Sequence, residues 1–170
     1  RHFIVDDEID SSAGGTRTIV MNVEDLNNVS FDFFHYGAVS TRDHNQYVRG
    51  RYSFQSNYAG GLRILDLSGI DQNTLVEVAF FDTYPQANDE SYDGQWSNYP
   101  FFASGNVIVS DINNGLFVLR PTGLLVSDEP AVPAGQSFAL SAPTPNPTSD
   151  AATLALTVAS PETVRAVVLD

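Results

Sequence analysis

One two-strand unit is written three times along the chain, and this repetition constrains the fold more than any other feature. Each copy is a short run of alternating apolar residues, a polar loop and a second alternating run; the copies span residues 3–20, 52–65 and 107–119. Arg17 lies 46 positions before Arg63, and Leu62 lies 54 positions before Leu116. A period of about 40–50 residues with four strands per repeat is typical of a β-propeller blade.

The middle copy predicts a complete blade. Aromatic and β-branched residues alternate at period two, between Gly and Asn, in four runs at residues 46–48, 52–54, 62–67 and 75–81, the first two joined by an Arg49-Gly50-Arg51 turn. The first copy (3–5, 16–23 and 29–34) lacks an inner strand, and the third (96–102, 106–109 and 116–119) lacks an outer one. The chain has no convincing 3.6-residue period, so we predict no α-helix.

Three partial blades cannot close a ring, because propellers have about 4–8 blades. We therefore expect an all-β fold in which residues 1–120 are blades from the C-terminal part of a larger propeller. The rest of the propeller, or neighbouring chains, would complete the ring. The alternative is a β-sandwich built from the same strands.

The last third of the chain differs in character. Residues 121–136 carry Pro130, Pro133 and Gly135 without periodicity, which indicates a linker. Residues 137–170 alternate at 153–158 and 164–169 around a turn at residues 160–162. Two strands do not make a stable domain, so this segment predicts a truncated, β-sandwich-like domain.

The charge balance narrows the class of partner. The net charge is −13, and all eight basic residues are Arg. Such a surface repels nucleic acid and anionic membranes, and it suits calcium or cationic partners. The chain has no Cys, which excludes disulfides and thiolate metal sites. No apolar run approaches the roughly 20 residues of a membrane span.

Blade topology predicts where a ligand would bind. The loop entering an inner strand and the loop between the second and third strands open on the same face of a propeller, and ligands bind on such concave faces. We expect the ligand-binding residues to be Arg42, Asp43, His44, Asn45, Tyr58 and Trp96. His44 could act as a base or a ligand, or make a structural hydrogen bond between blades. Trp96 could stack on a sugar, or pack between blades with Tyr99.

An acidic run predicts a calcium site. Asp6, Asp7, Glu8 and Asp10 offer hard oxygen ligands, as Ca²⁺ prefers, although the run lacks the glycine and distal glutamate of an EF-hand loop. The alternative is a solvated acidic loop, or a partner for Arg17 or Arg42.

The blade unit resembles the LVIVD-type propeller repeat, which begins with a His-Asp or His-Asn pair and ends in a Gly-Leu-led apolar run. Here these are His44-Asn45 and Gly61-Leu62-Arg63-Ile64-Leu65-Asp66-Leu67-Ser68. Residues 1–120 resemble the choice-of-anchor B family of bacterial surface proteins through several strings: Asp43-His44-Asn45-Gln46-Tyr47, Gly60-Gly61-Leu62-Arg63, Phe81-Asp82-Thr83, Trp96-Ser97-Asn98-Tyr99-Pro100, Ser104-Gly105 and Gly115-Leu116-Phe117-Val118.

The tail resembles the start of a type IX secretion sorting domain, on the marker Pro145-Asn146-Pro147. Together the two resemblances imply an exported protein that is cell-surface or secreted. Neither implies a settled catalytic activity. We expect a non-enzymatic module that binds a protein or glycan ligand, with Ca²⁺ as a candidate stabilising ion. The alternative is a secreted hydrolase of glycans or esters, which needs a buried His44 or a carboxylate with a strongly shifted pKa.

Overall fold

The structure is a computed structural model, and it describes residues 1–9, 15–124, 138–140 and 156–158. The chain divides into two units, Arg1–Asp128 and Glu129–Asp170. Within the described residues the elements are twelve β-strands and one short 3₁₀ turn, η1 (Ile70–Gln72), with no α-helix. The prediction of an all-β chain is confirmed. None of these elements is a helix of the length and hydropathy that a membrane span requires.

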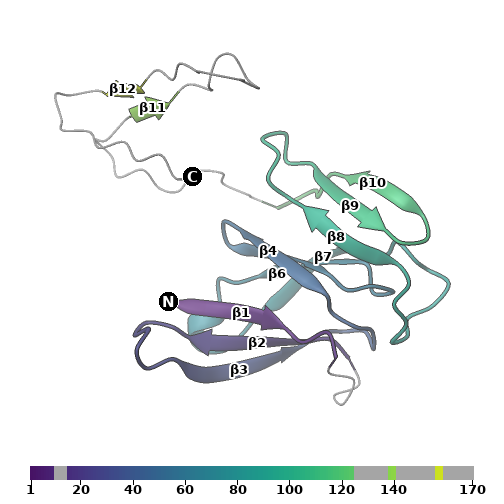
Figure 1. Cartoon of the computed structure of the whole chain (residues 1–170), viewed down its shortest axis with the longest axis horizontal. Helices are drawn as coiled ribbons and strands as arrows, with labels where there is room; N and C mark the ends of the chain where they lie inside the picture. Colours follow the sequence, from purple (N-terminus) through teal and green to yellow (C-terminus); the bar gives the residue numbers. More distant parts are fainter. Residues whose placement is uncertain (10–14, 125–137, 141–155, 159–170) are drawn as a thin grey trace, which may run out of the picture. The chain divides into compact units, whose positions relative to one another are not determined.

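The first unit contains three antiparallel sheets (Figure 1). The first sheet has the order β1 (His2–Asp6), β2 (Arg17–Asn22), β3 (Ser30–Tyr36). The middle sheet has the order β4 (Asn45–Arg49), β5 (Tyr52–Ser56), β6 (Leu62–Asp66), β7 (Val76–Phe81). The third sheet has the order β8 (Gln95–Tyr99), β9 (Val107–Asp111), β10 (Gly115–Leu119). Each strand thus pairs with its neighbours in the sequence, as the repeat predicts.

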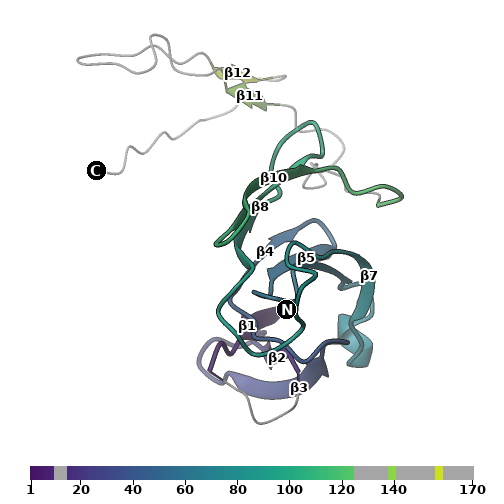
Figure 2. The same ribbon diagram turned by 90° about the vertical axis from the view of Figure 1, so that its right-hand side faces the viewer.

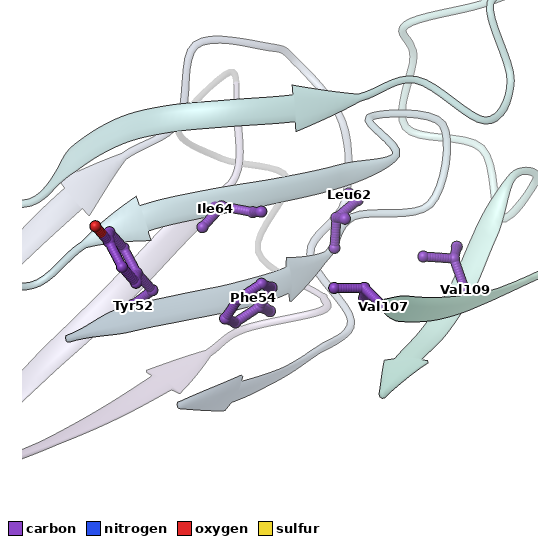
Figure 3. Packing of buried hydrophobic residues seen from close by; sticks show 6 residues of the cluster. All are labelled: Tyr52, Phe54, Leu62, Ile64, Val107 and Val109. Atoms are coloured by element: carbon purple, nitrogen blue, oxygen red, sulfur yellow. The ribbon is translucent and has the colours of Figure 1, made fainter. Parts of the chain in front are cut away.

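The middle sheet is covered on both faces. On one face, Leu65 and Leu75 pack with Val20 of the first sheet. On the other face, a larger apolar cluster joins the middle sheet to β9, through Tyr52, Phe54, Leu62, Ile64, Val107 and Val109 (Figure 3). All five residues of β5 are buried as a result. In a two-layer sandwich each sheet covers one face only, so this stack of three sheets does not fit the sandwich alternative.

Equivalent positions of the middle and third sheets face the same way. Leu62 and Ile64 of β6 point to the third sheet, whereas Leu65 points back to the first. In the third sheet Phe117 packs back on the middle sheet, while Leu116 and Val118, which match Leu62 and Ile64 in the repeat, stay 65% and 64% exposed. Side chains at matching positions of β6 and β10 therefore point to the same side of their sheets.

The sheets come closest at one edge. Among strands of different sheets, β4 approaches β8, β5 approaches β8, and β1 approaches β4. Figure 2 shows β4 between β1 and β8. The three sheets therefore converge at the edge that carries β1, β4 and β8, and the loops at the ends of these strands are brought together.

Several strand ends differ from the predicted ones. The run predicted over 96–102 ends as β8 at Tyr99, because Pro100 has no N–H to continue the ladder. In the second unit, the described part of the run predicted over 153–158 is β12 (Leu156–Val158), and it pairs with β11 (Phe138–Leu140), which the sequence did not predict. The run predicted over 164–169, the turn before it and Pro145-Asn146-Pro147 lie outside the described residues, as does most of the predicted linker.

Candidate functional site

Loops from all three sheets meet around the side chain of Tyr58. The β1–β2 loop supplies Glu8, the β3–β4 connection supplies Arg42 and His44, and the β5–β6 loop supplies Tyr58. The β7–β8 connection supplies Glu90 and Tyr92, and Trp96 stands on β8 just after it. We call these seven residues the loop-face cluster. It contains four of the six predicted ligand-binding residues: Arg42, His44, Tyr58 and Trp96.

The backbone of Tyr58 is held in an unusual conformation by two sheets. Its φ is 43°, in the left-handed region that a bulky aromatic residue seldom adopts. Its carbonyl oxygen accepts hydrogen bonds from the N–H groups of Gly61 (3.0 Å) and Gln95 (2.9 Å), so it ties the β5–β6 loop to β8. A Cβ on Gly94, whose φ is +89°, would come within 2.5 Å of this oxygen, so only glycine fits there.

The hydroxyl of Tyr58 forms the polar centre of the cluster. It donates a hydrogen bond to Glu8 on the β1–β2 loop. Nδ1 of His44 lies 3.1 Å from the same hydroxyl oxygen and 3.2 Å from Oε1 of Glu8. Burial, followed by the hydrogen bond to Glu8, raises the pKa of Tyr58, so the phenol keeps its proton at neutral pH. His44 therefore hydrogen-bonds to Tyr58 within the middle sheet and lies within ion-pair distance of Glu8 from the first sheet.

Aromatic rings surround this polar centre. The ring of His44 lies 4.2 Å from the indole of Trp96 and 5.0 Å from the phenol of Tyr58, measured between centroids. Tyr92 meets Tyr58 edge-on at 5.2 Å. Trp96 is 48% exposed and Tyr92 is 53% exposed, whereas Tyr58 is buried. Two of the rings thus present accessible aromatic surface beside the polar centre.

Arg42 fastens two of the loops to each other. Its Nε donates to the carbonyl oxygen of Glu90 at 2.7 Å, and its Nη1 donates to the carbonyl oxygen of Glu8 at 3.1 Å. Its guanidinium also lies over the ring of Tyr92, 4.8 Å from the centroid, and its Nη2 is 3.9 Å from the carboxylate of Glu90. Arg42 therefore fixes the position of Tyr92 as well as of the acidic loops.

Asp43 and Asn45, the other two predicted ligand-binding residues, hold the backbone beside the cluster. Asp43 is buried, and its Oδ2 accepts a hydrogen bond from the N–H of Arg17 at 3.0 Å. Asn45 donates from Nδ2 to the carbonyl oxygen of Trp96 at 2.9 Å and accepts at Oδ1 from the hydroxyl of Ser97. These contacts give both residues a supporting position between sheets.

The predicted calcium ligands point to different partners. Asp6 accepts from Gln46 of the middle sheet at 2.8 Å, Asp7 pairs with Arg17 at 3.5 Å, and Glu8 bonds to Tyr58. The pairing with Arg17 is the structural alternative that the sequence allowed. Asp10 lies outside the described residues. Within the part of the chain that the structure describes, no three His, Cys, Asp or Glu side chains are grouped to hold a metal ion, and calcium at these four residues stays a prediction.

The carboxyl group of Asp6 is the most perturbed acid beside the cluster. Burial, and then the negative charge of Asp43, raise its pKa to about 7, against a smaller opposing effect of the Thr18 hydroxyl. Its Oδ1 also accepts a hydrogen bond from Gln55. Its Oδ2 is buried with no hydrogen-bond partner among the described residues. Near neutral pH this group therefore exchanges a proton at the interface between the first and middle sheets.

Two cavities elsewhere in the first unit lack comparable chemistry. One, of about 270 Å³, lies beside Arg49, Ser104 and Arg120. The other, of about 360 Å³, lies between β6, β7 and β10 and is lined mainly by apolar side chains. Neither combines an acid with a neighbouring base, so the loop-face cluster is the stronger candidate site.

The sequence predicted no ligand-binding role for Glu90 or Tyr92. Both stand in the long connection between β7 and β8, which has no periodicity to indicate which side chains turn inward. Glu8, which the sequence predicts as a calcium ligand, accepts the hydrogen bond of Tyr58. A loop tyrosine followed by two glycines, as in Tyr58-Ala59-Gly60-Gly61, was the available signal for a tightly held turn.

Comparison of the chain with family models, with curated proteins and with solved structures found no significant match. The function must therefore be argued from the loop-face cluster and from the stack of sheets that builds it.

Proposed function

We propose that this chain is part of a β-propeller and acts as a binding or interaction module through its loop-face cluster. One observation carries the proposal: loops from three sheets are locked together by Tyr58, His44 and Arg42, while Trp96 and Tyr92 remain about half exposed beside them. A rigid scaffold that presents accessible aromatic rings among fixed polar groups is the arrangement expected of a recognition site.

Three features support the propeller. The middle sheet is covered on both faces, the sheets converge at the edge formed by β1, β4 and β8, and equivalent positions face the same way in successive sheets. The two outward faces of the stack are apolar: Phe3, Phe31 and Phe34 are exposed on the first sheet, and Tyr99, Leu116 and Val118 on the third. We propose that further blades cover both faces, supplied by the rest of the propeller or by neighbouring chains.

Variants of the exposed rings test the binding module. The double variant Trp96→Ala, Tyr92→Ala removes the accessible rings of the cluster, and Tyr99→Ala removes a ring on the same strand as Trp96 with the same 48% exposure. Biolayer interferometry against a panel of bacterial surface glycans and purified surface proteins should show binding that the double variant loses and Tyr99→Ala keeps. Equal binding by all three proteins would place the recognition surface elsewhere.

A secreted hydrolase is the second candidate, and two observations favour it. Nδ1 of His44 lies within hydrogen-bonding distance of an acid, and the buried carboxyl of Asp6 has a pKa of about 7. Within the described residues, however, the ring nitrogens of His44 reach only Glu8 and Tyr58, so no serine or threonine hydroxyl is set up as a nucleophile. Turnover of model glycans or esters that disappears in His44→Ala, with the fold retained, would establish this candidate over the first.

We also propose that the protein is exported to the cell surface or released, on the resemblance to choice-of-anchor B proteins and to a type IX sorting domain. The acidic surface, with a net charge of −13, is compatible with that location. Protease shaving of intact cells, with an internal cytoplasmic control, should remove the protein. Full protection from the protease in intact cells and absence from the medium would contradict export.

A further inference from the structure

We propose that the ligand of the loop-face cluster is a neutral sugar, bound with a ring face stacked on the indole of Trp96. This inference rests on the proposed binding function and names the class of ligand. It follows from the state of the aromatic faces, the pairing of the charges and the polar atoms left without a partner.

The first step concerns the aromatic faces. One face of the Trp96 indole is occupied by the ring of His44, 4.2 Å away between centroids, and Tyr58 meets its edge. The indole is nevertheless 48% exposed, so its other side is open. A flat apolar surface of this size matches the C–H face of a sugar ring, which buries apolar area while its hydroxyl groups point outward in the plane of the ring.

The second step concerns a cationic ligand, which would meet several groups that are already engaged. Arg42 lies over Tyr92 and beside the carboxylate of Glu90, and His44 contacts both Trp96 and Glu8. An ammonium or guanidinium at Tyr92, at Glu90 or on the His44 side of Trp96 would have to displace one of these partners. The exposed part of the indole stays accessible to a cation, so a cationic probe belongs in the test.

The third step excludes an anionic ligand. The cluster contains Glu8 and Glu90, Asp7 stands beside them, and the chain as a whole has a net charge of −13. Arg42, the arginine of the cluster, bonds to two backbone carbonyls, and Arg17 of β2 pairs with Asp7. Uronic acids, sulfated glycans and phosphates would meet a repulsive potential.

The fourth step concerns hydrogen bonding. Within the described residues, the indole N–H of Trp96 and Nε2 of His44 make no hydrogen bond to the protein. Oε1 of Glu8 takes the bond from Tyr58, so Oε2 is the oxygen of Glu8 that remains to accept from a ligand. The cluster thus offers a ligand one donor, one carboxylate acceptor and one imidazole nitrogen. Vicinal hydroxyl groups, which donate and accept at once, match this mixed set.

Trp96 supplies the readout, because it is the only tryptophan in the chain. Its emission therefore reports the proposed site directly. The wild-type chain is titrated with neutral oligomers of glucose, mannose and N-acetylglucosamine, with polygalacturonate as the anionic probe and an oligo-arginine peptide as the cationic one. Calorimetry on the same ligands gives dissociation constants for the variants.

A saturable change in Trp96 emission with one neutral oligomer, and none with the charged probes, is the expected result. Trp96→Ala should weaken that binding at least about tenfold, while Tyr99→Ala, the matched ring on β8, leaves it unchanged. Glu8→Gln provides a second variant, since it keeps an oxygen for Tyr58 but turns the free carboxylate oxygen into an amide donor. It should weaken the sugar severalfold without loss of thermal stability.

Other outcomes would overturn the inference in distinguishable ways. Saturable binding of the arginine peptide or of polygalacturonate at Trp96, without sugar binding, would keep the proposed binding function and reject the sugar. Sugar binding that Trp96→Ala and Glu8→Gln both leave intact would reject this site. Silence of Trp96 toward every probe, from a protein whose indole is still quenched by acrylamide, would reject the sugar site; the binding function would then rest on the panel of surface proteins.

Discussion

The buried carboxyl group of Asp6 gives the most direct test of the physical argument. In the folded chain its pKa is about 7, against 3.8 for an ordinary aspartate. The folded state therefore holds the proton more tightly than the unfolded state. Between those two values the unfolded chain binds fewer protons, so the free energy of unfolding must fall as pH rises and then level off above about pH 7.

The size of the effect follows from the shift. Each pKa unit corresponds to about 1.4 kcal/mol, so a shift of about three units sets an upper limit of about 4 kcal/mol. Because Asp6 is only partly buried as a whole residue, although its Oδ2 is fully buried, we expect about half of this limit, about 2 kcal/mol. The substitution Asp6→Asn keeps the shape and an oxygen for Gln46 and Gln55, and it removes the ionisation.

Urea denaturation of the wild type and of Asp6→Asn between about pH 5 and about pH 8 measures the effect. Burial lowers the pKa of His35, which makes stability rise with pH over part of the same range. For that reason the informative quantity is the difference between the two proteins at each pH. Because this window covers about two of the three pKa units, Asp6→Asn should gain about 1.3 kcal/mol relative to the wild type from the acid end to the alkaline end. Parallel curves, or a relative loss, would refute the reasoning.

Three further predictions follow from the loop-face cluster. Tyr58→Phe removes the hydroxyl between Glu8 and His44, so calorimetry should show a loss of about 1–2 kcal/mol; no loss would mean that water replaces the bond. Gly94→Ala should cost at least about 2 kcal/mol in urea, because its Cβ would meet the carbonyl of Tyr58, whereas Gly105→Ala, also at positive φ but with nothing within 4 Å, should cost only about 1 kcal/mol. The predicted calcium site at Asp6, Asp7, Glu8 and Asp10 requires that chelator lower the melting temperature by several degrees, because an ion bound only by the folded state stabilises it; an unchanged melting temperature would contradict the site.

The sequence predicts the sheets well because two of its signals are local: the period-two alternation of side chains, and the glycines that mark strand ends. In β6 the alternation of Leu62 and Ile64 with Arg63 and Leu65 sends adjacent side chains to opposite faces, and the glycines at residues 60–61 mark where the strand begins. The same signals place β10 at Gly115–Leu119. They fail at β11, a three-residue strand whose pairing with β12 depends on a distant segment.

Only the part of the candidate site that follows from blade topology could be predicted. The rule that certain loops open on one face brought Arg42, His44, Tyr58 and Trp96 together before any coordinates were known. The separate partners of the acidic run could not be predicted, because β1 ends at Asp6, which bonds to Gln46 of the middle sheet, while Asp7 follows the strand and pairs with Arg17. Glu90 and Tyr92 reach the cluster through the backbone path of a long irregular connection, and no local pattern encodes that path.

The position of the middle sheet determines the order in which parts of the first unit unfold. β5 and β6 are strands whose side chains contact both neighbouring sheets, so a substitution there loosens two interfaces, whereas one in β3 or β10 loosens a single interface. Unfolding should then begin as fraying of the flanking sheets and reach β5 last. The amide protons of Tyr52–Ser56 would accordingly be the slowest to exchange with solvent, because they become exposed only when the whole unit unfolds.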